Sequence, residues 1–293
     1  MRLLAFAFAL ALTIAHPAFA GLQDEVRVAF ATAQKYTNIR NAKREGWRPF
    51  GGEAPLMGRH YSHPDGVDYR TGDRIDFSKP SNLVYATIDG KTALVALAYV
   101  VRQRPGDPLP SGFTGSRDIW HVHNGDRFLA AVQETRPVIG SVIDRVFTQR
   151  MIRDDGHTQL AMVHLWLIPN PKGRFASHNP SLAYLDLGLP PERADDMTIA
   201  RGLALTRREG CAEALDAELW LSGAPRRVVR GIKAECRKAA DRVRAARAEG
   251  ILALEAEAAR QYRRVEDAVQ ISLTPAQLRR MTAFVEDGPG ICP

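Results

Sequence analysis

The sequence has few cysteines and no long apolar stretch beyond its first twenty residues. It contains three cysteines among 293 residues, at Cys211, Cys236 and Cys292. Because no two of them are close in sequence, a cysteine-based zinc site is disfavoured. A membrane-spanning helix needs about 20 consecutive apolar residues, and no segment after residue 20 supplies them. We therefore expect no transmembrane segment in the mature protein.

The familiar catalytic motifs are also missing. The sequence does not contain Gly-x-Ser-x-Gly, His-Glu-x-x-His, a P-loop or a dinucleotide fingerprint. It therefore lacks the motifs typical of the common hydrolase, zincin and nucleotide-binding classes. The formal net charge is +7, but no basic stripe is interleaved with aromatic residues, and we expect no nucleic-acid partner. For a basic protein outside the cytoplasm, anionic components of the cell envelope are the better match.

Residues 1–20 have the features of a secretory signal peptide. Arg2 precedes the apolar run from Leu3 to Ile14, and Ala18-Phe19-Ala20 offers the small residues that signal peptidase reads. The run is too short for a membrane anchor, because the hydrocarbon core is roughly 30 Å thick. We predict a periplasmic or secreted protein that begins near Gly21, in a compartment where disulfides form.

Residues 21–189 alternate short apolar runs with Gly, Pro and Asp, which is typical of strands and turns. Asp89-Gly90 separates the apolar runs 83–88 and 92–101, and this is the strongest short-range signal for a β-hairpin. A further buried strand is expected at 160–168. These signals predict a mainly antiparallel β domain.

An N-terminal helix is expected ahead of the strands. Val26, Phe30 and Ala33 recur at helical spacing within residues 22–45, and Gly46 lies just beyond them. The predicted fold class is therefore α+β, with a helix, a β domain that extends to residue 189, and a helical region over 190–293.

The C-terminal region is rich in Ala, Leu, Arg and Glu, a composition typical of helices. We expect one helix over about 192–221, a fold-back at Gly223, and a longer helix over about 225–269 with a kink at Gly250. A last helix should have Thr274 as its N-cap and a proline in its first turn. The many arginines here indicate a solvated helical face. The alternative is a face that binds a protein partner or an anionic surface.

The fold-back at Gly223 suggests a disulfide. Cys211 and Cys236 lie nearly equally far from Gly223 in sequence, so the two helices would bring them level. Such a bridge stabilises a protein by about 2–4 kcal/mol. Cys292 could replace either partner, so the pairing stays open between the three cysteines.

Four histidines are the strongest functional signal. His121 and His123 alternate along a predicted strand, which points both imidazoles to one side, and His164 belongs to the expected strand at 160–168. His60 follows a glycine-preceded turn. Imidazole nitrogens are common ligands of zinc and copper, so these four histidines are the predicted metal ligands.

Other residues around these histidines have weaker claims. His63, His157 and His178 have loop-like neighbours, and we rank them below the four. Glu53 is the carboxylate closest before His60 and is the candidate general base, should the site activate water for hydrolysis. The alternative for Glu53 is a solvated loop residue.

Several segments resemble a family of uncharacterised secreted bacterial and fungal proteins. The shared segments are Met-Gly-Arg-His-Tyr at 57–61, Pro-Ser-Asn-Leu-Val-Tyr at 80–85, Leu-Val-Ala-Leu-Ala-Tyr-Val at 94–100, and His-Leu-Trp at 164–166 followed by Asn-Pro-Lys-Gly-Arg-Phe at 170–175. The resemblance covers roughly residues 28–189 and implies a secreted domain of unassigned activity. Many of these relatives carry an acidic residue where this chain has Ala98, which makes the segment with His121 and His123 the replacement for a carboxylate ligand.

Three functions are compatible with these observations. The first is a secreted or periplasmic protein whose histidine-rich site holds zinc or copper and activates water. The second is an envelope protein that binds or buffers the metal without turnover. The third is a module that binds a ligand other than a metal, or a protein partner, through its C-terminal helices. Metal content separates the third function from the other two.

Overall fold

The fold is built on one seven-stranded sheet with helices at both faces. The computed structural model describes residues 21–115, 119–137, 156–207 and 215–283. Six strands follow the order β1-β2-β4-β5-β7-β6 with antiparallel neighbours, and β3 adds to β5 in parallel. The strands are β1 Arg48–Ala54, β2 Gly58–Ser62, β3 Tyr69–Arg70, β4 Asn82–Ile88, β5 Lys91–Gln103, β6 His121–Asn124 and β7 Gln159–Trp166. The predicted α+β class is confirmed.

The hairpin predicted from Asp89-Gly90 is the centre of the sheet. Asp89 has φ 46° and Gly90 has φ 70°, the left-handed pair that a two-residue hairpin turn requires. The two strands on either side, β4 and β5, pair from Ile88 and Lys91 outward. The local signal was sufficient here because the turn and both apolar runs agree.

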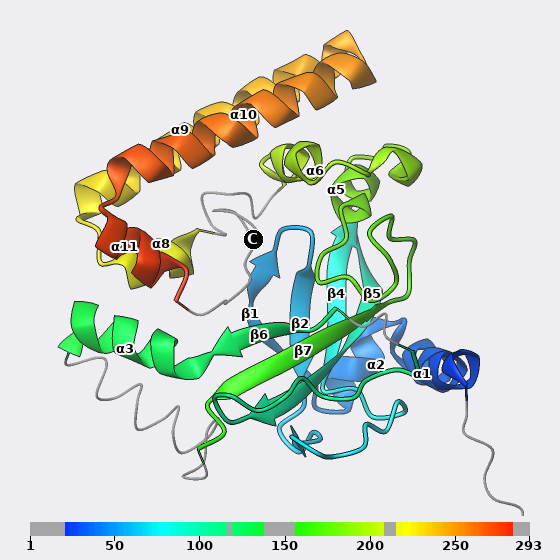
Figure 1. Ribbon diagram of the computed structural model, residues 1–293. Coiled ribbons are helices and arrows are strands. Elements are labelled where there is room, and N and C mark those ends of the chain that lie inside the picture. The colour runs from blue at the N-terminus through cyan, green and yellow to red at the C-terminus, as the bar shows by residue number, and fades with distance from the viewer. Residues whose placement is uncertain (1–20, 116–118, 138–155, 208–214, 284–293) are drawn as a thin grey trace, which may run out of the picture.

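One face of the sheet carries the main hydrophobic core. Alternate residues of β4, β5 and β7 face two helices, α1 Leu22–Tyr36 and α2 Ile39–Arg44 (Figure 1). The hydroxyl of Tyr85 donates to the backbone oxygen of Tyr36 at 2.7 Å. The single helix expected over 22–45 is divided, because Asn38 caps a new helix by accepting from the amide of Arg40.

The opposite face carries a second, smaller hydrophobic cluster and the histidines. Val84, Ala96, Ala98 and Trp166 pack there against Leu182. Leu182 belongs to α5 Ser181–Asp186, which contacts α6 Met197–Ala204. β6 leads directly into α3 Gly125–Thr135, whose N-cap is Asn124.

The C-terminal helices differ from the sequence prediction at two places. The helix expected over 192–221 is replaced by a short 3-10 turn, η3 Pro191–Arg193, then α6, then α8 Asp216–Ser222. Asp196 begins α6 by accepting from the amides of Thr198 and Ile199. The cap at Asp196 therefore starts a new helix within the segment for which the composition predicted one continuous helix.

Gly250 reverses the chain and does not kink it. After the short η4 Arg247–Glu249, Gly250 has φ 102° and ψ 171°, a conformation that is essentially restricted to glycine. The helices α9 Arg226–Ala246 and α10 Ile251–Ser272 then lie side by side (Figure 1). The long helical hairpin therefore folds at Gly250, whereas Gly223 ends α8 with φ 68°.

The start of the last helix agrees with the sequence prediction, whereas the predicted disulfide is not tested. Thr274 forms a capping box at the start of α11 Pro275–Met281, as predicted. Cys236 is buried on α9, while Cys211 and Cys292 lie outside the described residues, so the disulfide stays a prediction. The same holds for the signal peptide at 1–20.

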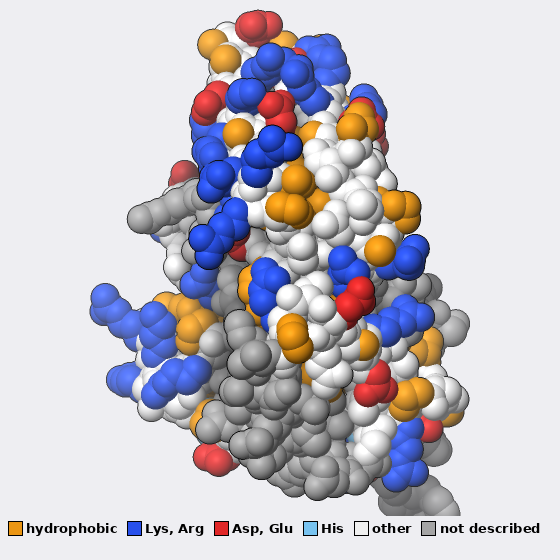
Figure 2. Space-filling model, turned by 90° about the vertical axis from the view of Figure 1, so that its left-hand side faces the viewer, with side chains coloured by type: hydrophobic (Ala, Val, Ile, Leu, Met, Phe, Trp, Pro, Cys, Tyr) orange, Lys and Arg blue, Asp and Glu red, His pale blue; other side chains and the backbone are white. Residues whose placement is uncertain are grey.

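The arginines of α9 form a solvated face, as expected. Arg226, Arg230, Arg237 and Arg242 are all exposed, and Figure 2 shows Lys and Arg side chains gathered over the upper, helical part of the molecule. A partner for this face stays a prediction. No helix in the described ranges has the length and apolar character to cross a membrane.

One hydrophobic cluster joins Leu56 and Tyr184 to Leu203 and Leu254, so it extends across the domain boundary predicted at residue 190.

Candidate functional site

The four histidines chosen from the sequence come together on one face of the sheet. The Nε2 atoms of His60 and His164 lie 3.0 Å apart. The ring of His121 stacks on that of His164 with centroids 5.1 Å apart, and the rings of His121 and His123 are separated by 5.2 Å. His60 lies within strand β2, where we expected a turn.

Strand alternation explains how these rings meet. His121 and His123 are two residues apart on β6, so they leave the strand on the same side. β6 pairs with β7, which carries His164, and Ala98 of β5 lies directly opposite His164 in the ladder. The small side chains between His60 and His164 leave space above the sheet that the two imidazoles fill.

Burial keeps these imidazoles neutral. It lowers the pKa of His60 to about 4 and that of His123 to about 4, from an ordinary value near 6.5. Burial and the charge of His123 lower the pKa of His121 to about 2, and burial holds the pKa of His164 well below the usual range. Neutral imidazole is the form that binds a metal ion.

Several ring nitrogens of this group have no hydrogen-bond partner. His121 is 5 % exposed and His164 is fully buried, yet both nitrogens of His121 and Nδ1 of His164 have no partner among the described residues. A buried polar group without a partner costs about 1–3 kcal/mol. Three such atoms lie together here. Either a bound ion or molecule contacts them, or other interactions in the fold offset the free energy that they cost.

His178 joins the group, although the sequence analysis ranked it lower. It is buried in the loop before α5, and its Nδ1 lies 3.0 Å from the hydroxyl of Ser177. Its Nε2 has no partner in the described segments. Burial, then the charges of Arg201 and His123, lower its pKa to about 4. We call His60, His121, His123, His164 and His178 the histidine cluster.

The spacing of the rings is close to that of a metal site, but their orientation is not. Two imidazole nitrogens at about 2.0–2.1 Å from one tetrahedral zinc ion lie about 3.3 Å apart, with ring centroids about 5 Å apart. The centroids of His60 and His164 are 5.3 Å apart. As the side chains lie, however, no group of three or more His, Cys, Asp or Glu residues in the described ranges could hold a metal ion.

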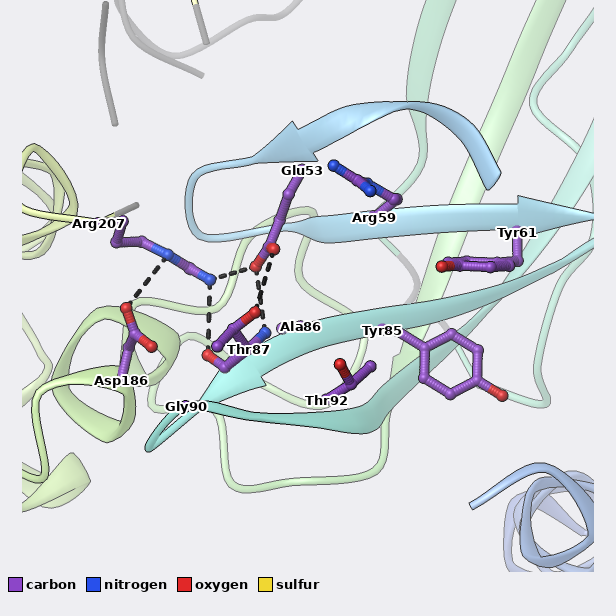
Figure 3. Close-up of a pocket in the computed structure, with 10 residues that line it drawn as sticks. All are labelled: Glu53, Arg59, Tyr61, Tyr85, Ala86, Thr87, Gly90, Thr92, Asp186 and Arg207. Atoms are coloured by element: carbon purple, nitrogen blue, oxygen red, sulfur yellow. Dashed lines mark hydrogen bonds and ion pairs between the residues drawn. The ribbon is translucent and has the colours of Figure 1, made fainter. Parts of the chain in front are cut away.

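Glu53 has different neighbours. Its carboxylate accepts from the amide of Thr87 at 3.2 Å and from the Thr87 hydroxyl at 3.4 Å, and it pairs with Arg207. These residues line a cavity with Asp186, and none of the histidine cluster lines that cavity (Figure 3). The role of Glu53 as a general base stays a prediction, and its contacts give it a structural partner in Arg207.

A second cavity lies on the histidine face. It has a volume of about 350 Å³, and its lining includes His60, Met162 and Asn82. Met162 lies opposite His121 in the ladder between β7 and β6. This cavity therefore leads from the surface toward the edge of the histidine cluster.

Acid should destabilise the metal-free protein. The pKa of His60, His123 and His178 is near 4 in the folded chain and about 6.5 when unfolded. The unfolded chain therefore binds more protons in this window, and the free energy of unfolding falls by up to about 1.4 kcal/mol per pH unit for each histidine. Thermal unfolding of chelator-treated protein should show a constant Tm above pH 7 and a steep fall from pH 6.5 toward 4.

The interval from pH 6.5 to 5 is the informative part of that measurement, because most carboxylates titrate below it. Burial raises the pKa of Glu218 to about 7, so this carboxyl acts in the opposite direction and offsets about one histidine, which leaves a net fall from the others. A Tm that does not change between pH 7.5 and 5 would contradict a cluster of buried neutral histidines.

Comparison of the chain with protein-family models, with curated proteins and with solved structures finds no match to any of them.

Proposed function

We propose that the protein binds a single transition metal ion, zinc or copper, through His60, His121, His123 and His164. The observation that carries the proposal concerns His121. It is buried, neither of its ring nitrogens has a partner within the part of the chain that the structure describes, and its ring contacts those of His123 and His164. A neutral imidazole that ligates a metal through one nitrogen satisfies that nitrogen without a hydrogen bond.

The required movement is small. Ring centroids 5.1 to 5.3 Å apart already fit the separation in a tetrahedral site, about 5 Å. Rotations of the imidazoles about their terminal torsions, which have broad energy wells, turn the nitrogens toward a common point. The backbone register of β6 and β7 would stay as it is.

We favour binding over hydrolysis. A general base must lie within hydrogen-bond reach of the water that it activates, or one water away. Glu53 is the only carboxylate that the sequence offered for this role, and its partners are Arg207 and Thr87. Hydrolysis therefore lacks support from the contacts of its candidate base.

Copper and zinc both suit these ligands. Imidazole binds either ion, and the intrinsic order of affinities places copper above zinc. The thioether of Met162 is a soft donor on the same face as His164 and next to His121 in the ladder, which favours copper in its reduced state. Metal identity is therefore part of the test.

The test is a metal titration of untagged, chelator-treated protein at pH 7.5. Calorimetry should show one equivalent of Zn²⁺ or Cu²⁺ bound per chain, and elemental analysis of protein purified without a histidine tag should show the native metal. Absence of binding for both ions would overturn the proposal. Substoichiometric binding that a His63→Gln variant abolishes would also overturn it, because His63 contacts Trp47 and the backbone of Glu45, apart from the cluster.

A further inference from the structure

A polar cavity that carries no assigned role lies at one end of the sheet, apart from the histidine cluster. Its volume is about 560 Å³, within the range of about 300–1,000 Å³ that small-molecule sites occupy. The lining comes from β1, β2, β4, β5, the end of α5 and the segment after α6 (Figure 3). It comprises Glu53, Arg59, Tyr61, Tyr85, Ala86, Thr87, Gly90, Thr92, Asp186 and Arg207.

The charged groups that the described residues bring to this cavity balance. Two guanidinium groups, of Arg59 and Arg207, and two carboxylates, of Glu53 and Asp186, line it within that part of the chain. Arg207 pairs with Glu53, and its Nε lies 3.5 Å from an oxygen of Asp186. An anionic ligand would meet the two carboxylates, and a cationic ligand would meet the two guanidinium groups. The cavity therefore favours a ligand without net charge.

Hydrogen-bonding capacity remains in this network. Arg207 is 7 % exposed, and its Nη1 has no acceptor among the described residues. Asp186 makes the ion pair with Arg207 but accepts no hydrogen bond within the same ranges. Asp186 lines the cavity and therefore offers it a hydrogen-bond acceptor, whereas Nη1 of Arg207 is fully covered and does not reach the cavity.

A hydroxyl group can use this acceptor. It donates a hydrogen bond to Asp186 without bringing a charge, whereas a carboxylate or phosphate can only accept and an ammonium brings a positive charge beside the two guanidinium groups. Figure 3 shows the Tyr61 side chain extending from β2 toward the space between β2 and β4. Its ring offers an apolar surface next to the polar end of the cavity.

We propose that this cavity binds a neutral polyhydroxylated ligand, a free mono- or disaccharide, with a hydroxyl held by Asp186 and the sugar ring beside Tyr61. This site is separate from the histidine cluster, and sugar binding does not depend on metal.

The experiment is ligand-observed NMR by saturation transfer with the full chain. The probes are glucose, galactose, mannose, N-acetylglucosamine, maltose and cellobiose, with succinate and inorganic phosphate as anionic comparisons. We expect saturation transfer to at least one sugar and none to the two anions.

Two variants locate the binding. Asp186→Asn keeps the size of the side chain and should weaken sugar binding at least tenfold. Thr92→Trp fills the cavity from an exposed position of β5 and should abolish binding. Lys91→Trp is the matched control, because it adds the same bulk at the preceding exposed position, which points to the other face of the strand. Thermal unfolding of each variant shows whether it is folded.

Three outcomes overturn the proposal. In the first, folded wild-type protein gives no saturation transfer to any of the six sugars. In the second, succinate or phosphate binds and Thr92→Trp removes that binding, which makes the ligand an anion. In the third, a sugar binds but folded Asp186→Asn and Thr92→Trp proteins bind it with unchanged affinity.

Discussion

The double variant His121→Ala/His123→Ala should lose metal binding, with affinity reduced more than about a hundredfold, since removal of even an outer partner of a ligand costs about 10–100-fold. Both rings contact the centre of the histidine cluster, and His121 carries the unpartnered nitrogens on which the metal proposal depends. Calorimetric titration with Zn²⁺ and Cu²⁺ at pH 7.5 measures the change.

Two controls accompany this variant. Far-UV circular dichroism should retain the helical signal, because α9 and α10 have their own apolar cluster around Cys236, Tyr262 and Val265. The variant His63→Gln should bind metal with wild-type affinity. Unchanged affinity in the double variant would show that the pair on β6 has a packing role only.

Gly202→Ala should destabilise the protein by about 3 kcal/mol or more, at or above the upper end of the cost of overpacking a core. A Cβ at Gly202 would lie 2.0 Å from the carbonyl oxygen of Ala258 and 2.3 Å from its carbonyl carbon. Because these are backbone atoms of α10, no side-chain rotation relieves the clash, and α6 must move away from α10.

The matched control is Gly231→Ala on α9. Apart from the backbone of its own helix, no atom of the described residues lies within 4 Å of a Cβ at Gly231, and the residue is exposed. Alanine should therefore stabilise by up to about 1 kcal/mol through helix propensity. Thermal unfolding should therefore show opposite shifts, with a fall in Tm of about 6–12 °C for Gly202→Ala. A Tm for Gly202→Ala at or above that of the wild type would contradict the close approach of α6 and α10.

The fold was predictable where local signals agreed. The turn at Asp89-Gly90 and the capping box at Thr274 each depend on a few adjacent residues, and both are found where expected. The reversal at Gly250 was missed, because a glycine within a helical composition permits a kink, a stop or a reversal equally well. Packing of α9 against α10 decides between them, and that packing joins residues far apart in sequence.

The candidate site shows the same division. His121 and His123 could be placed on one side from strand alternation alone, and His164 from its apolar strand. His178 could not, because a loop residue has no periodicity to indicate where it points. Arg207 was also missed, since it meets Glu53 from 154 residues away. Glu53 consequently looked like a partner of His60, which is near in sequence but faces elsewhere.

Strand β2 carries residues of both proposed sites in immediate succession. His60 belongs to the histidine cluster, while its neighbours Arg59 and Tyr61 line the cavity proposed for a sugar. Because side chains alternate along a strand, a slip of β2 by one residue against β4 would exchange the two faces. A single-residue insertion or deletion within β2 should therefore abolish both sites together, whereas the same change in the loop after Ser62 should spare both. During evolution, an insertion or deletion in this strand would have been rejected if either site was required, so the two sites share one constraint on the length of β2.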